Sequence, residues 1–539
     1  MADFGPDERT VVHVIRRASE TCPDKVWIAS EDARATYGEL DIASNRLAHG
    51  FLSQGLEPGD TMLFMLPDLA DYVATWVACS KAGIVEVPVN TAYRGDILIH
   101  VVNDSRATVM ICDAEYLDRL DAVADNLNSL KRVFVYCRPG MDVPETPRLD
   151  RTCERIPFDA LLSNDTSAPN HIPVISDLKA IMYTSGTTGP SKGVMVSQAH
   201  AFEYAIGAAN GLELGPDDVY YTAGLPLFHI AGKWGVIYAA ALHGAMAAFP
   251  DRFSATGFWD DVRSYSATTT FLLGAMANFL QRQPESPNDA DTPLNKVLMC
   301  PLLPDVDDFA NRFGARIATA YGSTEVGAPV FMPLGTPVRD LQFVGPVRTD
   351  KFTVCVLDEN DAAVPPGTLG EIAVRPNEPW ITMLGYWNQP EWTVRMWRNQ
   401  WLHSGDAGRY DEDGNIYFVD RIKDAIRRRG ENISSMEVEA IVSQHPAIAE
   451  CAVYPVASEY SEQEVAVAIV LKPDHELDME PLIRWLEPRM PYFMVPRYVT
   501  RIPELPKTPT GKIQKYSLRE NGVTDTTWDR EAAGVKVAR

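Results

Sequence analysis

Hydrophobic residues in the first 170 or so positions follow two different spacings. Leu40–Gln54 is amphipathic with helical spacing and ends near Gly55, and Asp71–Lys81 also predicts a helix. Between and after these helices lie short apolar runs that predict buried strands. These runs are Met62–Leu66, Ile84–Pro88, Val109–Cys112 and Val133–Tyr136. Such alternation of strands and helices predicts βαβ units that build a parallel sheet.

The pattern changes twice further along the chain. Arg138–Ala168 is rich in Pro, Asp and Ser, which predicts an excursion over the surface. Strand–helix alternation resumes from Leu178 to about Phe313. After Tyr321 the runs become strand-like, for example at Thr353–Leu357, so a β-rich subdomain is expected there. A second such run is Glu371–Val374.

A charged stretch, Asp420–Asp424, precedes a mixed region of about 100 residues at the carboxyl end. This region contains a predicted helix, Ser435–Gln444, and two predicted strands, Cys451–Tyr454 and Val465–Leu471. The residues after Gly522 are expected to form a loose tail.

These patterns predict an α/β protein of two domains. Residues 1–422 would form a large domain of stacked βαβ sheets with the β-rich subdomain. Residues 423–539 would form a small, mobile α+β domain, with the boundary near Lys423. The size agrees, because 539 residues, 46% of them hydrophobic, exceed what one core needs.

Hydropathy predicts no transmembrane segment. The mean hydropathy is −0.14, and the longest apolar stretch, Val236–Phe249, is too short for a bilayer and is interrupted by His243. The acidic amino terminus lacks the apolar region of a secretory signal. The expected location is therefore the cytoplasm.

The eight cysteines include no CxxC pair, which argues against both a disulfide framework and a zinc site. The formal net charge of −24 repels nucleic acid and anionic membranes, so neither is an expected partner. It also repels phosphorylated substrates. Any phosphate site must therefore be built locally from backbone N–H groups, Lys, Arg and Mg²⁺.

Thr184–Gly193 is such a candidate, because it is rich in Gly and Thr and follows an apolar run, Ala180–Tyr183. Its glycines let the backbone turn and present N–H groups to an anion, and its hydroxyls add donors. Lys192 adds a positive charge, so the set suits a polyphosphate. Its spacing fits neither GxxxxGK[ST] nor GxGxxG. A flexible surface loop is the alternative interpretation, because the same composition favours it.

The whole pattern resembles the signature of the adenylate-forming superfamily, which includes acyl-CoA synthetases, firefly luciferase and the adenylation domains of peptide synthetases. Further blocks stand in the expected order from about Thr10 to Arg519. They are Pro226–His229, Tyr321–Glu325, Ser404–Asp406, Asp420–Asp424, Gly430–Asn432 and Pro509–Lys512. The Arg-rich form that precedes Gly430 looks most like the crotonobetaine/carnitine–CoA ligase branch, near the fatty-acid–CoA ligases.

The resemblance implies an acid–thiol ligase that uses ATP, CoA and Mg²⁺. A carboxylic acid and ATP would give an acyl-adenylate and diphosphate, and CoA would then give acyl-CoA and AMP. The small residues Ala231, Gly232 and Gly235 would leave room for a medium-chain or bulky acid, as in lipid metabolism. The alternatives are adenylation of an amino acid or aryl acid for another acceptor, and a non-catalytic nucleotide-binding relative. The protein could assemble as a homodimer.

The resemblance also implies roles for individual residues. Those that contact ATP or AMP would be Thr184, Ser185, Gly186, Thr187, Thr188, Gly189, Lys192, Tyr321, Gly322, Asp406 and Arg421. Those that serve catalysis would be Thr324, Glu325 and Lys512, with Glu325 also holding Mg²⁺. The acyl pocket would include His229, Gly232 and Cys300. CoA would meet Arg429, Gly430 and Glu431, and Lys423 would be the hinge.

Each of the isolated motif residues also has an ordinary structural interpretation. Glu325 could be an acid at a helix start, and Asp406 could belong to a common Gly-Asp turn. Lys423 could be an exposed linker residue, and Lys512 a solvated lysine in a Pro-rich loop. His229 follows Phe228 in an apolar stretch, where histidine is more often packed than catalytic.

Two segments depart from the family pattern. Arg427–Arg429 stands where many relatives have glycine, and it could form a guanidinium cluster for CoA phosphates or a solvated face. Met299–Pro304 stands where relatives usually have Gly-Ala beside adenine and the acyl group. Cys300 and Pro301 therefore alter the predicted pocket.

Overall fold

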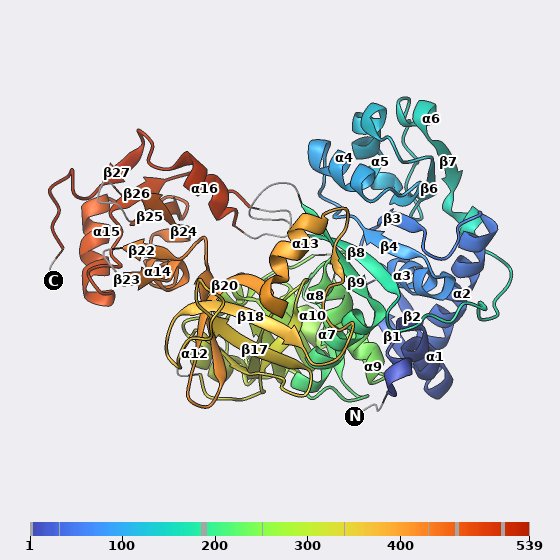
Figure 1. Cartoon of the computed structure of the whole chain (residues 1–539), viewed down its shortest axis with the longest axis horizontal. Helices are drawn as coiled ribbons and strands as arrows, with labels where there is room; N and C mark the ends of the chain where they lie inside the picture. The colour runs from blue at the N-terminus through green and yellow to red at the C-terminus, as the bar shows by residue number, and fades with distance from the viewer. Residues whose placement is uncertain are drawn as a thin grey trace. The chain divides into compact units, whose positions relative to one another are not determined.

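The structure is a computed structural model. It describes residues 4–31, 33–184, 191–250, 252–338, 340–428, 431–458, 463–507 and 513–537, with the backbone alone for Arg427, Glu431 and Asn432. The chain forms two compact units (Figure 1). The first contains Met1–Thr353 and Val374–Leu402, and the second contains Val354–Ala373 and His403–Arg539. These limits follow contacts within each unit, and the hinge near Lys423 stays a prediction.

One sheet of the first unit is mostly parallel and has the order β19-β9-β8-β4-β3-β5-β6-β7. Its strands are β3 (Thr61–Met65), β4 (Val85–Pro88), β5 (Val109–Asp113), β6 (Arg132–Tyr136), β7 (Glu154–Pro157), β8 (Leu178–Thr184), β9 (Lys192–Ser197) and β19 (Gly385–Tyr386). Parallel pairing runs from β8 through β4, β3, β5 and β6 to β7. The predicted βαβ alternation is therefore confirmed.

A second sheet of the first unit has the order β15-β14-β13-β12-β10-β11-β1-β2 and is parallel except at its two edges. Its strands are β1 (Val26–Ala29), β2 (Arg34–Thr36), β10 (Val219–Tyr221), β11 (Met246–Ala248), β12 (Thr269–Leu273), β13 (Lys296–Cys300), β14 (Arg316–Ser323) and β15 (Gly327–Met332). The same unit contains β16 (Phe343–Pro346).

Helices connect the strands of the first unit. They are α1 (Val11–Thr21), α2 (Tyr37–Ser53), α3 (Ala70–Ala82), α4 (Gly95–Asp104), α5 (Leu117–Val123), α6 (Leu149–Thr152), α7 (Gln198–Gly211), α8 (Ile230–Gly232), α9 (Ala239–Leu242), α10 (Phe258–Tyr265), α11 (Gly274–Gln281), α12 (Val306–Phe313) and α13 (Pro390–Met396). Shorter turns are η1 (Pro6–Glu8), η2 (Ala114–Tyr116), η3 (Ala124–Asn126), η4 (Phe158–Leu161), η6 (Arg398–Gln400) and the π-helical turn η5 (Lys233–Tyr238). The start of α2 shows why the sequence is helical there. Thr36 accepts a hydrogen bond from the Glu39 N–H, and the Glu39 carboxylate accepts one from the Thr36 N–H.

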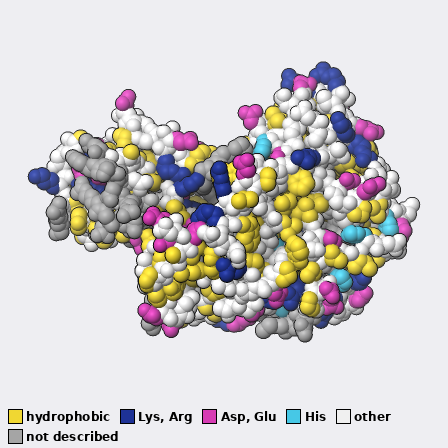
Figure 2. Space-filling view, viewed as in Figure 1, with side chains coloured by type: hydrophobic (Ala, Val, Ile, Leu, Met, Phe, Trp, Pro, Cys, Tyr) yellow, Lys and Arg dark blue, Asp and Glu magenta, His cyan; other side chains and the backbone are white. Residues whose placement is uncertain are grey.

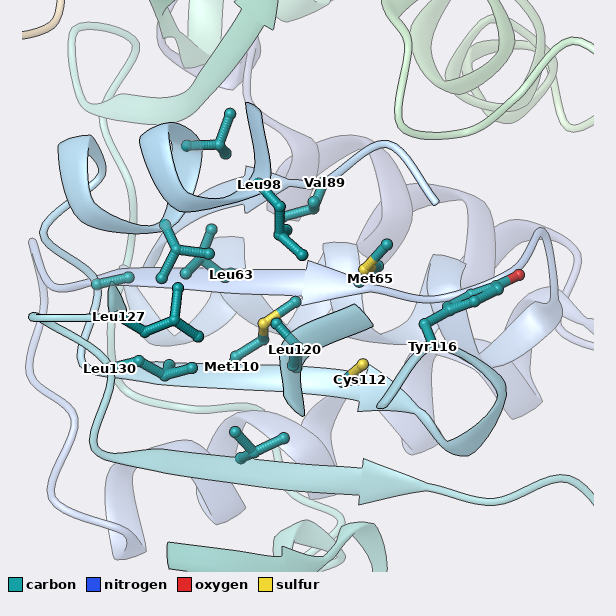
Figure 3. Packing of buried hydrophobic residues seen from close by; sticks show 14 of the residues in the cluster. Leu63, Met65, Val89, Leu98, Met110, Cys112, Tyr116, Leu120, Leu127 and Leu130 are labelled. Carbon is teal, nitrogen blue, oxygen red and sulfur yellow. The ribbon is translucent and has the colours of Figure 1, made fainter. Parts of the chain in front are cut away.

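The core of the parallel sheet consists of apolar side chains from adjacent strands. Leu63 of β3 and Met110 of β5 lie side by side, and Leu98 of α4 and Leu120 of α5 pack against them (Figure 3). Strand β5 is buried along its whole length. This is why its run in the sequence is continuously apolar rather than alternating.

The second unit consists of smaller sheets. One has the order β21-β20-β18-β17, one is the pair β22-β23, and one has the order β24-β25-β26-β27. Their strands are β17 (Phe352–Leu357), β18 (Gly370–Pro376), β20 (Leu402–Tyr410), β21 (Asn415–Arg421), β22 (Ile426–Arg428), β23 (Glu431–Ile433), β24 (Ile448–Ala457), β25 (Gln463–Leu471), β26 (Tyr498–Arg501) and β27 (Thr527–Asp529). The helices of this unit are α14 (Ser435–Val442), α15 (Met479–Leu486) and α16 (Lys515–Asn521), followed after α15 by the turn η7 (Glu487–Arg489). The β-rich and α+β predictions for this part of the chain are confirmed.

Two predictions about surface segments are wrong. Arg138–Ala168 is not only an excursion, because β7 closes the parallel sheet and Leu149 and Leu161 are buried. The residues after Gly522 are not a loose tail, because β27 pairs with β26 and the side chain of Arg530 is buried. Its guanidinium donates hydrogen bonds to the backbone oxygens of Pro496 and Val535, both at 3.2 Å.

Acidic side chains are scattered over the viewed face rather than gathered at one place (Figure 2). All eight cysteines are free thiols. Within the described ranges, no helix combines the length and apolar character needed to cross a membrane.

Candidate active site

The phosphate-loop candidate connects two strands of a hairpin. Strands β8 and β9 pair antiparallel, with Thr184 opposite Lys192 at the end where the loop joins them. The Tyr183 hydroxyl donates to Asp104 Oδ2 at 2.6 Å, which ties the end of β8 to α4. The predicted contacts Ser185, Gly186, Thr187, Thr188 and Gly189 lie outside the described residues. The structure thus places the two ends of the loop, Thr184 and Lys192, next to each other.

Lys192 lies against two aromatic rings. Its Nζ is 3.5 Å from the ring centroid of Trp392 and 5.4 Å from that of Tyr386. Attraction between an ammonium and a ring face contributes about 0.5–2 kcal/mol, depending on solvation. The rings therefore hold a positive charge at the exit of the candidate phosphate loop.

Glu325 lies in the turn between β14 and β15, and its carboxylate is oriented by two hydroxyls. Ser323 Oγ donates to Oε2 at 2.9 Å, and the Tyr386 hydroxyl donates to Oε1 at 3.0 Å. The Glu325 carbonyl accepts a hydrogen bond from the Met383 N–H at 2.9 Å. The bonds from the two hydroxyls use two of the roughly four acceptor positions of the carboxylate, so this carboxylate retains capacity for a hard cation such as Mg²⁺.

Tyr386 connects these two charged groups, since its hydroxyl binds Glu325 while its ring faces Lys192. Sequence reasoning missed both Tyr386 and Trp392. They follow Glu325 by more than sixty residues and lie in β19 and α13, so no local spacing links them to the motif.

The residues before Glu325 are packed closely. Tyr321 and Thr324 are each 6% exposed. A Cβ on Gly322 would lie 2.1 Å from the carbonyl oxygen of Gly327, so the approach of β14 to β15 requires glycine here. The predicted nucleotide-binding block is therefore a tight turn with little freedom.

The predicted acyl-pocket residues lie on segments of the same unit. His229 is half-buried, caps α8 through a hydrogen bond from the Ala231 N–H to its Nδ1 at 3.2 Å, and accepts the Lys233 N–H at its carbonyl. The Cys300 Sγ lies 3.6 Å from Thr319 Oγ1 and from the Ala320 oxygen, and burial raises the pKa of this thiol. The Cys300–Pro301 peptide bond is cis.

The argument that small residues leave room is wrong for Gly232. A Cβ there would lie 2.6 Å from the carbonyl oxygens of Leu225 and Pro226, so this glycine allows backbone to pack on backbone. At Gly235 a Cβ would meet the rings of Tyr204 and Phe271 at 3.3 and 3.8 Å. Gly235 therefore adjoins an aromatic wall rather than an open space.

The predicted ribose contacts pair with each other in the second unit. Asp406 of β20 lies opposite Arg421 of β21, and Arg421 Nε is 2.9 Å from Asp406 Oδ1. The side chain of Asp406 is 4% exposed and that of Arg421 is 48% exposed. Arg421 thus orients the carboxylate and also presents part of its guanidinium to solvent.

Lys423 lies in an exposed turn between β21 and β22. Its neighbours in the charged stretch are anchored. Asp420 Oδ2 accepts hydrogen bonds from the Ser435 N–H at 2.7 Å and from its hydroxyl, while Asp424 pairs with Arg519. The turn at Lys423 therefore lies between two fixed acidic residues.

The idea of a three-arginine cluster for CoA phosphates is wrong, because Arg428 points inward. Its side chain is 3% exposed, its Nε lies 2.6 Å from Glu464 Oε2, and its Nη1 donates to the Phe493 carbonyl at 2.7 Å. Strand β22 pairs with β23 as far as Arg428, which lies opposite Glu431, and Ile426 of the same strand belongs to the core of this unit. Of the predicted CoA contacts, Arg429 and Gly430 lie outside the described residues, and Glu431 is described by its backbone, which pairs with Arg428. Lys512 also lies outside them.

Comparisons with known proteins give matches over most of the chain. The model of the AMP-binding enzyme family matches residues 15–387, and the model of the AMP-binding enzyme C-terminal domain matches residues 437–512. Curated relatives include the crotonobetaine/carnitine–CoA ligase of Salmonella agona (strain SL483), which is 30% identical over 490 residues. That alignment covers 90% of this chain and 93% of the relative. The ligase of the same name from Salmonella typhi is 29% identical, and the alignment again covers 90% of this chain and 93% of the relative.

Similar solved structures cover nearly the whole chain. ATP-bound MatB from Rhodopseudomonas palustris has a TM-score of 0.81 and 25% identity, and the match covers 95% of this chain and 99% of that one. The anthranilate CoA ligase AuaEII in complex with anthranoyl-AMP has a TM-score of 0.83 and 21% identity, covering 96% and 98%. At 21% identity, the match to AuaEII supports only the assignment of the fold. The chain thus shares its α/β fold with both of these proteins.

Proposed function

Because the chain belongs to the AMP-binding enzyme family, we propose that it is an ATP-dependent carboxylate–CoA ligase that works through an acyl-adenylate. The acid and ATP give acyl-AMP and diphosphate, and CoA then displaces AMP to give the acyl-CoA thioester. The matched relatives named as CoA ligases support this reaction.

The contact of Tyr386 with both Glu325 and Lys192 carries the proposal. One residue connects a carboxylate with acceptor capacity for Mg²⁺ and an ammonium at the exit of a Gly- and Thr-rich loop. ATP bound by AMP-forming ligases needs both kinds of group. The cation bridges phosphate oxygens, and the lysine offsets the charge on the leaving diphosphate.

The first step brings a carboxylate to an α-phosphate, so repulsion between two anions must be reduced where they meet. Glu325 would hold Mg²⁺, which supplies positive charge to the phosphates, and Thr324 would contact a phosphate oxygen. Lys512 would bridge the carboxylate and the α-phosphate. Tyr321 would lie against adenine, and Asp406 with Arg421 would bind the ribose hydroxyls.

The second step requires that Lys512 leave and that the segment Arg429–Glu431 approach the thiol of CoA. We place the hinge for this exchange at Lys423, in the exposed turn between β21 and β22, with residues 1–422 and 423–539 as the two domains. A turn of this kind needs few residues to absorb a change of backbone angles.

The acid would be a medium-chain or bulky carboxylate with an apolar body. Tyr204 and Phe271 supply aromatic surface beside Gly235, and the half-buried Cys300 adds a polarisable thiol. Aromatic faces also accommodate quaternary ammonium groups such as the one in carnitine. Trimethylammonium acids therefore belong in the same screen as fatty and aryl acids.

We also place the enzyme in the cytoplasm, because its eight cysteines are all free thiols, as a reducing compartment maintains them. The homodimer stays a prediction that sedimentation velocity would decide.

A screen of AMP release tests the proposal, with fatty, steroid-side-chain, aryl and betaine acids, each with and without CoA. At least one class should release AMP and consume CoA in equal amounts. Adenylate that accumulates without CoA consumption would favour the non-CoA acceptor. AMP release from none of the four classes would contradict the ligase.

A further inference from the structure

Leu227 is held at both of its backbone groups by side chains from another part of the first unit. Asp68 Oδ1 accepts a hydrogen bond from the Leu227 N–H at 2.9 Å. The Tyr72 hydroxyl donates to the Leu227 carbonyl at 2.9 Å. Tyr72 and Leu227 are each 1% exposed. Such a clamp fixes one residue in position and in orientation.

Leu227 lies two residues before His229, at the start of the predicted acyl-pocket segment. The carbonyl of His229 accepts the Lys233 N–H at 3.1 Å, and its own N–H donates to Pro226. The segment 226–232 is therefore fixed by Asp68 and Tyr72 at one end and continues into η5 at the other.

The far end of the segment is fixed by charge. Lys233 Nζ lies 2.9 Å from Glu86 Oε2, and Lys179 Nζ lies 3.0 Å from Glu86 Oε1. All three side chains are at most 1% exposed. Because Lys179 belongs to β8 and Glu86 to β4, this chain of charges ties η5 to the strand that enters the phosphate loop.

The charges of Glu86, Lys179 and Lys233 also account for an acidic residue at position 68. Two ammonium groups face a single carboxylate in Glu86, and Asp68 interacts electrostatically with Lys233. Loss of hydration raises the pKa of Asp68 to about 7 and lowers that of Lys233 to about 8. Asp68 thus combines a hydrogen bond to Leu227 with a charge that balances Lys233.

We propose that Asp68 and Tyr72 are positioning residues for the carboxylate substrate, acting through Leu227 on the segment that carries His229. This inference rests on the proposed ligase function and adds two residues outside every motif of the sequence. Tyr72 lies in the first turn of α3 and Asp68 lies two residues before this helix, which contributes no predicted contact to ATP. Their loss should therefore weaken use of the acid and spare use of ATP.

The test compares Tyr72→Phe, Asp68→Ala and Asp68→Asn with a control, Tyr136→Phe. The control also removes a hydrogen bond donated by a tyrosine hydroxyl, since Tyr136 donates to the carboxylate of Asp71 in α3. It leaves the hydrogen bonds of Leu227 unchanged. Tyr72→Phe and Asp68→Ala should lower kcat/KM for the acid roughly tenfold, the effect of losing one buried hydrogen bond. The KM for ATP should change less than twofold. Asp68→Asn should recover most of the activity, because its amide oxygen still accepts the Leu227 N–H.

Hydrogen exchange at Leu227 provides a second readout that does not depend on catalysis. The amide should exchange faster in Tyr72→Phe and Asp68→Ala than in the wild type, and at the wild-type rate in Tyr136→Phe. Unchanged exchange, or equal losses for acid and ATP, would overturn the inference. A wild-type protein that forms no acyl-adenylate contradicts the ligase function instead, and the exchange data still decide whether the clamp exists.

Discussion

Replacement of Glu86 by glutamine should be the most destabilising conservative change in the first unit. The carboxylate is fully buried and pairs with Lys179 at 3.0 Å and Lys233 at 2.9 Å. Glutamine keeps the shape and one acceptor oxygen, but it removes the carboxylate charge with which both ammonium groups pair. Removal of one partner from a buried ion pair costs about 3–5 kcal/mol. We expect a loss of about 3 kcal/mol at pH 7, since the amide oxygen retains part of the hydrogen bonding.

The loss should shrink as the pH rises. Burial lowers the pKa of Lys233 from 10.5 to about 8, so the folded protein releases this proton at a lower pH than the unfolded chain does. Between these values the unfolded state binds more protons, and stability from this group therefore rises with pH. At pH 9.5 the wild type has already lost the Lys233 charge, and Glu86 then has only Lys179 to pair with in the cluster.

Urea unfolding followed by tryptophan fluorescence measures both effects, because Trp76 and Trp234 are buried in this unit. The matched control is Glu213→Gln, which breaks the exposed pair with Arg316, with side chains 59% and 48% exposed. Exposed pairs contribute at most about 1 kcal/mol. If Glu86→Gln destabilised no more than this control at pH 7, or if its loss grew between pH 7 and 9.5, the reasoning would be refuted.

Three further outcomes are expected. In diphosphate-exchange assays, Glu325→Gln should slow adenylation roughly 10²-fold or more. Tyr386→Phe should slow it roughly tenfold and raise the Mg²⁺ concentration that the enzyme requires. If neither variant changed the Mg²⁺ dependence, the assigned metal site would be contradicted. Lys512→Ala should abolish acyl-AMP formation but leave thioester formation from supplied acyl-AMP largely intact, and equal loss of both steps would refute its role. The pKa of Asp68 rises from 3.8 to about 7, so its contribution to stability is fully present below about pH 4 and is lost as the pH rises through 7. Asp68→Asn should therefore flatten the dependence of the unfolding free energy on pH in that window, and an unchanged slope would count against the raised pKa.

The sequence predicted those elements whose apolar signal is continuous. The buried strands β3, β5 and β6 and the amphipathic helix α2 were predicted within a few residues, because burial on both faces or on one stripe leaves a clear pattern. Edge strands β7 and β27 were missed. Both are short, their residues are partly exposed, and their pairing with β6 and β26 leaves no apolar run.

Charged residues were the second source of error. Arg428 was expected on the surface or against CoA, yet Glu464 pairs with it inside the second unit. Glu86, Lys179 and Lys233 come from three separate elements, and only the fold brings them together. The motif blocks predicted where Glu325 and Lys192 occur. Tyr386, which joins them, could not be predicted, because its role depends on tertiary contact rather than spacing.

The central claim is that the acid attacks the α-phosphate of ATP and becomes an acyl-adenylate. The most direct measurement follows oxygen from an acid labelled with ¹⁸O in its carboxylate, using the substrate class that the screen identifies. The account predicts one labelled oxygen in AMP, with diphosphate unlabelled and acyl-CoA formed in equal amount. Label in inorganic phosphate together with ADP would show attack at the γ-phosphate and would contradict the account.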